Sequence, residues 1–212
     1  MEGKKYMENT FLTIKEKEYS AELVEKKSKF IAKIVKVSSE DEAMDVLKSV
    51  KKEHRDARHN VFAYRIANSS ERFSDDGEPS GTAGVPILDI LRGEKLQNVL
   101  LVVTRYFGGI LLGTGGLVKA YSGAAKDAIA KAEKVEMKLC NEYSVEVDYS
   151  YHNILLHYFK EDSIIVRDTT YTDNICLNIV VEQKLGDSIV AKITEKTDRT
   201  AKIELKETYY LG

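Results

Sequence analysis

Cysteine and proline are scarce in this chain of 212 residues, which has two of each. Cys140 and Cys176 show neither a CxxC nor a Cys/His ligand spacing, so we expect reduced thiols and no metal or other cofactor. No apolar run reaches the ~18 residues of a membrane span. The first residues also lack the apolar core of a signal peptide. These absences predict a cytoplasmic protein without a membrane segment.

Charge of one sign is also lacking, because 32 Lys and Arg nearly balance 34 Asp and Glu. This balance argues against a protein that coats nucleic acid with its whole surface. Residues 1–135 hold 23 basic and 20 acidic residues, whereas residues 136–212 hold 9 and 14. An anion or RNA contact is therefore expected in the first part, although a solvated surface of mixed charge explains so mild an asymmetry as well.

Glycine, in contrast, is concentrated in one stretch. Nine of the thirteen glycines and both prolines lie between Asp75 and Tyr121. Two glycine-rich segments, 75–84 and 108–116, flank an apolar strand predicted at 98–107. Because glycine permits positive φ and close approach of a backbone or ligand, we expect the functional site here.

Hydrophobic periodicity predicts the elements of the first part. Ser39 and Glu42 form a capping-box pattern that opens a helix over 40–53. Pro86 suits the first turn of a second helix, which Gly93 ends, and a third helix is predicted over 116–134. Besides 98–107, strands are expected at 11–17, 20–26, 29–37, 60–66 and 71–74.

After about residue 135 glycine nearly vanishes and the pattern becomes βαββαβ, the order of a ferredoxin-like module. The helices are predicted at 151–161 and 185–196, and the strands at 138–149, 163–169, 174–182 and 200–206. We therefore expect an α+β protein of two domains, 1–135 and 136–212.

The second glycine segment is a candidate anion site, because it lies directly before the helix predicted at 116–134. Free N–H groups and the dipole at a helix N-terminus can hold a phosphate or carboxylate. The residues concerned are Gly113, Thr114, Gly115 and Gly116, with Arg105 at the preceding strand end and Lys119 in the first helical turn. The alternative is a tight strand-to-helix connection without a ligand.

The first glycine segment is acidic and offers a second candidate site. Clustered carboxylates can bind a cation or act as an acid/base pair, but Asp and Ser more often cap turns and helix starts in such loops, which we favour. The residues of this polar site are Asp75, Asp76, Glu78 and Ser80, with His59 before a predicted strand. No serine or cysteine shows a nucleophile elbow.

Five segments together resemble the signatures of the IMPACT/YigZ family over residues 20–130. They are Lys27–Phe30, His59–Asn60 with Ala63–Arg65, Asp75–Gly84, Thr104–Gly109 and Leu112–Tyr121. The resemblance implies a first domain of the α/β fold shared by a ribosomal protein and GHMP kinases, followed by a ferredoxin-like domain. It also implies a link to translation, since eukaryotic members regulate initiation. They do so with a partner-binding domain for which we expect no counterpart here.

Three functional hypotheses follow. The leading one is a non-catalytic regulator or accessory factor of translation that binds RNA or a ribosome-associated protein through basic residues of the first domain, namely Lys27, Lys29, Arg65, Arg105 and Lys119. The second is an enzyme acting on phosphate esters or nucleotides at the glycine segments, with a phosphate-bearing ligand. The third is a protein-interaction module. The oligomeric state stays open.

Overall fold

The computed structural model describes residues 9–212, which hold five α-helices and ten strands. The chain divides into two compact units, Met1–Glu136 and Met137–Gly212. The protein is thus α+β, with two five-stranded sheets. No helix in the described part is long and apolar enough to cross a membrane.

The first unit is built on a sheet with β6 (Val99–Tyr106) at its centre. The order is β2 (Glu18–Glu25), β3 (Ser28–Lys36), β6, β4 (His59–Arg65) and β5 (Glu71–Ser74), and all neighbours run antiparallel. Seven of the eight residues of β6 are buried, as expected for the apolar strand predicted at 98–107. Outside this order, β1 (Thr10–Ile14) forms a parallel bridge between Leu12 and Leu96.

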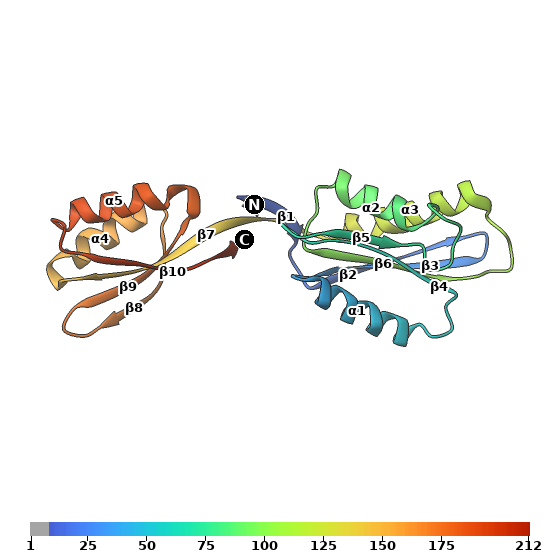
Figure 1. Cartoon of the computed structure of the whole chain (residues 1–212), viewed down its shortest axis with the longest axis horizontal. Coiled ribbons are helices and arrows are strands. Elements are labelled where there is room, and N and C mark those ends of the chain that lie inside the picture. Colours follow the sequence, from blue (N-terminus) through green and yellow to red (C-terminus); the bar gives the residue numbers. More distant parts are fainter. Residues whose placement is uncertain (1–8) are drawn as a thin grey trace, which may run out of the picture. The chain divides into compact units, whose positions relative to one another are not determined.

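Helices cover both faces of this sheet (Figure 1). On one face lies α1 (Glu40–Glu53), and on the other lie α2 (Gly84–Gly93) and α3 (Gly113–Lys131). Alternate residues of a strand point to opposite faces. Accordingly Phe30, Ala32 and Ile34 join the core beneath α2 and α3, whereas Val35 packs in the core under α1.

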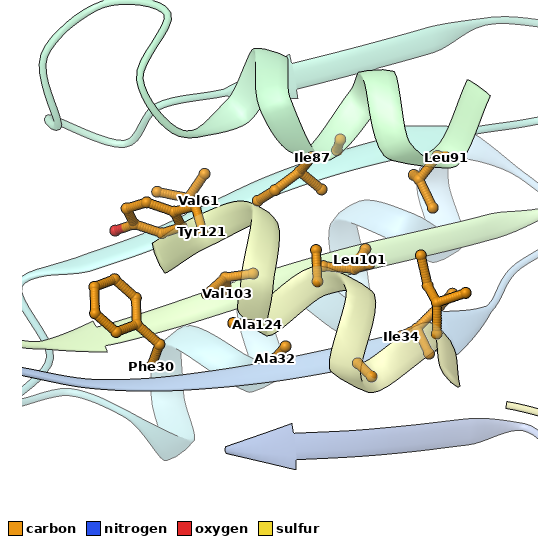
Figure 2. Close-up of a cluster of buried hydrophobic side chains, with 14 of the residues drawn as sticks. Phe30, Ala32, Ile34, Val61, Ile87, Leu91, Leu101, Val103, Tyr121 and Ala124 are labelled. Atoms are coloured by element: carbon orange, nitrogen blue, oxygen red, sulfur yellow. The ribbon is translucent and has the colours of Figure 1, made fainter. Parts of the chain in front are cut away.

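The larger core lies between the sheet and α3 (Figure 2). Ala120, Ala124 and Ala128 are buried on the helix face toward the sheet, so their small side chains allow a close approach. Tyr121 lies on the same side, and its ring meets Phe30 edge-on with 5.1 Å between the centroids. In the close-up its hydroxyl oxygen points away from the labelled aliphatic side chains.

The second unit has the βαββαβ order that the pattern predicted. Its elements are β7 (Lys134–Val147), α4 (Tyr149–Glu161), β8 (Ile165–Tyr171), β9 (Ile175–Glu182), α5 (Gly186–Lys196) and β10 (Lys202–Leu211). The strands run β10-β7-β9-β8, with these neighbours antiparallel, and β1 next to β7 is the fifth strand of this sheet. Val145, Leu155, Leu177 and Ile193 are fully buried in its core, between the sheet and the two helices.

Some boundaries differ from the prediction. The third helix begins at Gly113 rather than 116, so the last four residues of the second glycine segment form its first turn, and Lys119 lies in the second turn. Glycine has low intrinsic helix propensity, but packing of the helix on the sheet overrides it. The last strand reaches Leu211 instead of ending near 206, because it stays paired with β7 out to Lys138.

The start of α1 follows the predicted cap. Ser39 Oγ accepts a hydrogen bond from the N–H of Glu42 at 3.1 Å. The Glu42 carboxylate in turn accepts bonds from the N–H and hydroxyl of Ser38, each at 2.8 Å. These bonds hold the pKa of Glu42 below its ordinary value. In the usual capping box the carboxylate of Glu42 would accept from the N–H of the N-cap residue, Ser39. Here it accepts from Ser38, one residue earlier.

Substituting Ser39→Ala is expected to lower the free energy of unfolding by about 1 kcal/mol, because the N–H of Glu42 loses its acceptor. Urea denaturation measures this change. Ser49→Ala is the control, since Ser49 donates only to the carbonyl of Asp45 within the helix, a contact with little net value. Equal stability of the Ser39→Ala variant and the wild type would contradict the cap.

Candidate functional site

The candidate site lies where the last residues of β6 meet the first residues of β3 and β4. Arg105 is the register partner of Phe30 on β3 and of His59 on β4. Beyond Arg105 the chain continues through Tyr106 and Phe107 into the loop that leads to α3. The two glycine segments therefore converge on one end of the sheet.

A pocket of about 360 Å³ opens at this end. Its polar walls come from two arginines, one histidine and one glutamate, and its apolar walls come from the loop before α3 and from α3 itself. The lining includes Arg58, His59, Glu78, Arg105, Phe107 and Leu117, together with Gly113 and Thr114 at the start of α3. Such a mixture of apolar walls and a few convergent polar groups is typical of ligand sites.

A buried ion pair forms the floor of the site. Nη1 of Arg105 donates to Oε1 of Glu78 at 2.6 Å, and their side chains are only 7% and 4% exposed. The hydroxyl of Tyr121 donates to the same oxygen at 2.8 Å. Burial, and then the charge of Glu78, raise the pKa of Tyr121, so its hydroxyl stays protonated as a donor. The negative charge of Glu78 is thus compensated from two elements.

Two arginines flank one aromatic ring at the pocket. The guanidinium carbon of Arg58 lies 5.4 Å from the ring centroid of Phe107, and that of Arg105 lies 5.7 Å from it. Arg105 also lies 5.5 Å from the ring centroid of Phe30. These distances fit cation–π contacts. Nε of Arg105 is buried and has no hydrogen-bond partner in the described part of the chain.

The carboxylate of Asp75 caps the start of α2. It accepts hydrogen bonds from the N–H groups of Gly81, Ala83 and Gly84 at 2.9, 3.0 and 2.8 Å. An acidic side chain is favourable there because of the partial positive charge at a helix N-terminus. The hydrogen bonds therefore show that Asp75 caps this helix start.

Asp76 and His59 hold each other in place. The carboxylate of Asp76 accepts from the N–H of Asn60 at 2.7 Å and from Lys51 at 2.8 Å. Its carbonyl oxygen lies 2.8 Å from Nδ1 of His59, so Nδ1 carries a proton, and Nε2 lies 3.8 Å from Glu78. Ser80 is exposed on the same loop. Among residues 9–212 no group of three His, Cys, Asp or Glu side chains could hold a metal.

The second glycine segment is held against a hairpin turn. Lys26 and Lys27 form the turn between β2 and β3 with φ of 43° and 65°. A Cβ on Gly108 would overlap the backbone of Lys27, and the N–H of Gly108 donates to Ser28 Oγ at 3.2 Å. The loop then exposes apolar side chains, with Leu111 83% exposed. We use the name tip surface for the exposed residues of these segments, namely Lys27, Arg58, Phe107, Ile110, Leu111, Val118 and Lys119.

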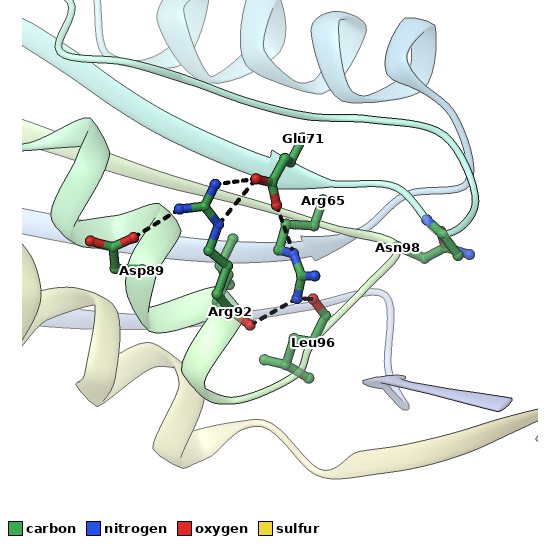
Figure 3. Close-up of polar contacts among 8 residues, drawn as sticks. Arg65, Glu71, Asp89, Arg92, Leu96 and Asn98 are labelled. Atoms are coloured by element: carbon green, nitrogen blue, oxygen red, sulfur yellow. Dashed lines mark hydrogen bonds and ion pairs between the residues drawn. The ribbon is translucent and has the colours of Figure 1, made fainter. Parts of the chain in front are cut away.

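Two of the predicted basic residues do not join this site. Lys29 pairs with Glu22 at 2.7 Å, and its position two residues before Ile31 and six before Val35 places it on the sheet face toward α1. Arg65 lies at the other end of β4 (Figure 3). It donates to Glu71 at 3.2 Å and to the carbonyl of Leu96 at 3.0 Å. Its role there is to tie β4 and β5 to the end of α2.

The neighbouring contacts support that assignment of Arg65. Arg92 donates from Nε to Glu71 at 3.0 Å and from Nη1 to Asp89 at 3.1 Å. Both arginines thus share one carboxylate in the close-up. The bonds from Arg92 lower the pKa of Glu71, which keeps it ionised between them.

Sequence reasoning missed Arg58, Phe107 and Tyr121 as site residues. A tyrosine on a buried helix stripe usually needs a hydrogen-bond partner, which was a usable signal for Tyr121. Arg58 lies directly before β4, and no pattern in the sequence marks it as a site residue. Only the fold shows that it lies over Phe107.

The fold and site together define a class: an α+β unit in which a buried Arg–Glu pair lies between glycine-rich turns, beside an aromatic ring flanked by two arginines. Residues 26–129 match the Impact N-terminal domain. The chain is 36% identical to the IMPACT family member YvyE of Bacillus subtilis over 207 residues, which cover 97% of this chain and 95% of that protein. This chain belongs to the IMPACT family.

Other relatives agree. An IMPACT family member of Haemophilus influenzae is 34% identical over 189 residues, covering 86% of this chain and 90% of that protein. Protein IMPACT of Rattus norvegicus is 34% identical over 100 residues, which cover 45% of this chain and 32% of that protein. A solved structure described as a hypothetical protein matches with a TM-score of 0.64 and 29% identity, covering 95% of this chain and 99% of that one.

Removing one partner of the buried pair should strongly destabilise the first unit. Arg105→Met is expected to lower the free energy of unfolding by about 3–5 kcal/mol, because it leaves Glu78 buried and uncompensated. The double variant Arg105→Met, Glu78→Met should recover much of this loss. Lys15→Met is the control, because the exposed pair of Lys15 and Glu133 contributes about 0–1 kcal/mol. Chemical denaturation of the wild type and the three variants measures these differences in the free energy of unfolding.

The contact at Gly108 gives a second stability prediction. Gly108→Ala should lower the free energy of unfolding by about 1–3 kcal/mol, since its Cβ has to displace the hairpin turn. At Gly115 an added Cβ meets nothing within 4 Å, so Gly115→Ala should cause no loss. Similar melting temperatures for the two variants would refute the close approach at Gly108.

Proposed function

We propose that this protein is a cytoplasmic, non-catalytic regulator or accessory factor of translation. It binds RNA or a ribosome-associated partner through the first unit. The observation that carries the proposal is the exposed Arg58 guanidinium held on the ring of Phe107. Planar arginine and aromatic groups are the usual platforms on which single-stranded nucleic acid stacks its bases.

The surroundings of this platform support the proposal. Lys27 and Lys119 are exposed on the tip surface, and neither forms an ion pair within residues 9–212. Their charges are free to meet phosphates, whereas Lys29 and Arg65 are engaged with carboxylates. The exposed apolar side chains of the loop, Phe107, Ile110 and Leu111, favour contact with a partner.

We further infer that the units correspond to two domains, 1–135 and 136–212, with different roles. The helices on both faces of the first sheet support the ribosomal-protein/GHMP-kinase-like fold. The strand order β10-β7-β9-β8 supports a ferredoxin-like fold for the second unit. The acidic balance of residues 136–212 makes the second domain the less favourable one for contacting phosphates.

The alternative is an enzyme acting on phosphate esters or nucleotides at the glycine segments. It has less support, because the carboxylates of Asp75 and Asp76 are engaged by backbone N–H groups. Only Glu78 and His59 remain at the pocket as acid/base candidates, and Glu78 is neutralised by Arg105.

Binding of a fluorescent single-stranded RNA, measured by anisotropy, tests the proposal. Affinity should fall as salt rises, with a slope of about −0.7 for each phosphate contacted. Lys27→Ala should make this slope shallower by roughly one contact. Arg58→Ala should also lose stacking, which contributes about 1–3 kcal/mol per base. Lys29→Ala serves as the matched control on the opposite sheet face and should bind like the wild type.

Salt-independent binding, or wild-type binding by the Lys27→Ala, Arg58→Ala double variant, would count against an RNA contact at the tip surface. A pull-down treated with ribonuclease then separates the two partner classes. A ribosomal protein that stays bound after RNA removal, but not to the double variant, identifies a protein contact at the same surface.

A further inference from the structure

Arg105 carries more hydrogen-bonding capacity than the protein uses. Its side chain is 7% exposed, yet within residues 9–212 its guanidinium forms one hydrogen bond, from Nη1 to Glu78. Nε is buried and has no hydrogen-bond partner among the described residues. A buried guanidinium with unused donors is costly unless something else accepts from it. Arg105 lines the pocket, so a ligand inside it is an acceptor that fits the guanidinium N–H groups other than the buried Nε.

The first turn of α3 brings more donors to the same pocket. Gly113 and Thr114 line it, and no side chain of the described residues caps this helix. An added Cβ at Gly113 or Gly115 would meet nothing within 4 Å, so the space beside these backbone groups is open. The N-terminus of a 19-residue helix carries a partial positive charge. Free N–H groups there bind phosphate.

The charges around the pocket also favour an anion. Glu78 is the one acidic residue of its lining, and Arg105 compensates it. Arg58 at the rim then adds a positive charge. Both hydrogen bonds received by Glu78 end on Oε1. Oε2 therefore stays available for a hydroxyl or amine donor of a ligand, a feature that a bare inorganic anion does not have.

The remaining walls suit a planar, weakly polar group. Pro79, Phe107, Leu112 and Leu117 line the pocket beside the donors, and Arg58 lies on Phe107. The volume of about 360 Å³ falls in the range of small-molecule sites. A ligand that matches all these groups has a phosphate, a hydroxyl-bearing spacer and a flat ring system.

We propose that this pocket binds a nucleoside 5′-monophosphate group, either as a free nucleotide or as the 5′ end of an RNA. The phosphate accepts from Arg105, Arg58 and the N–H groups at the start of α3. A ribose hydroxyl donates to Glu78, and the base lies against the Arg58–Phe107 pair. The RNA form rests on the proposed function, whereas the free nucleotide does not.

Thr114 offers a variant that separates loss of the site from loss of the fold. It is exposed at the pocket in the first turn of α3. Thr114→Glu places a negative charge where the phosphate would bind, yet an acidic residue near a helix N-terminus favours the helix. Thr114→Gln is the matched control of the same size. Thermal unfolding should therefore show Thr114→Glu at least as stable as Thr114→Gln.

Calorimetric titration of the full chain with AMP, adenosine and inorganic phosphate tests the pocket directly. We expect AMP to bind at least about tenfold more tightly than either fragment. Thr114→Glu should bind AMP about tenfold or more weakly than Thr114→Gln, which has the same size but no charge. Anisotropy with one RNA sequence, 5′-phosphorylated or 5′-hydroxylated, identifies the source. A preference for the phosphorylated end points to RNA, and AMP binding without that preference points to a free nucleotide.

Equal binding of adenosine and AMP, equal behaviour of the two Thr114 variants, or phosphate binding as tight as AMP would overturn the proposal. So would the absence of both AMP binding and an end preference. If AMP does not bind and the two RNAs bind equally and with a salt dependence, the pocket assignment fails while the proposed function stands. If the chain binds AMP but no RNA, the pocket assignment stands while RNA binding as part of the proposed function fails.

Discussion

The buried contact between Arg105 and Glu78 is the interaction on which the first unit depends. Arg105 lies near the end of the central strand, β6, and Glu78 belongs to the first glycine segment, so their pairing fixes that segment against the sheet. Tyr121 extends the contact to α3. Three separate parts of the chain are thereby held by one carboxylate oxygen. The charges have little water around them, so each is tolerated only because the other is present.

Glycine serves this arrangement in two different ways. At Gly108 it allows the loop to touch the hairpin turn at Lys27, which any side chain would prevent. At Gly113 it permits a φ of 72° and leaves open space at the start of α3. The first use is architectural and the second exposes backbone donors. In the second unit Gly186 serves in the first way, because a Cβ there would lie 2.6 Å from the hydroxyl of Tyr143.

Periodicity in the sequence predicted most of the fold, because β3 alternates over most of its length and α1 has its cap at Ser39. The composition change near residue 135 also indicated where the second pattern begins. The site was less accessible. Arg65 and Arg105 look alike in sequence, and only the strand register puts one at the pocket and the other beside Glu71. Arg58 gives no local signal, because its stacking partner lies 49 residues away in the chain.

The position of β6 in its sheet has a consequence for synthesis. β3 and β4 both precede it in the chain, yet β6 lies between them and pairs with each. Until the residues of β6 have left the ribosome, both earlier strands have an open edge and an uncovered apolar face. Open edges of this kind invite wrong pairing. Val99, the first residue of β6, comes 34 residues after Arg65, the last residue of β4. During synthesis β3 and β4 therefore stay without their shared partner strand until at least that much more chain has been made.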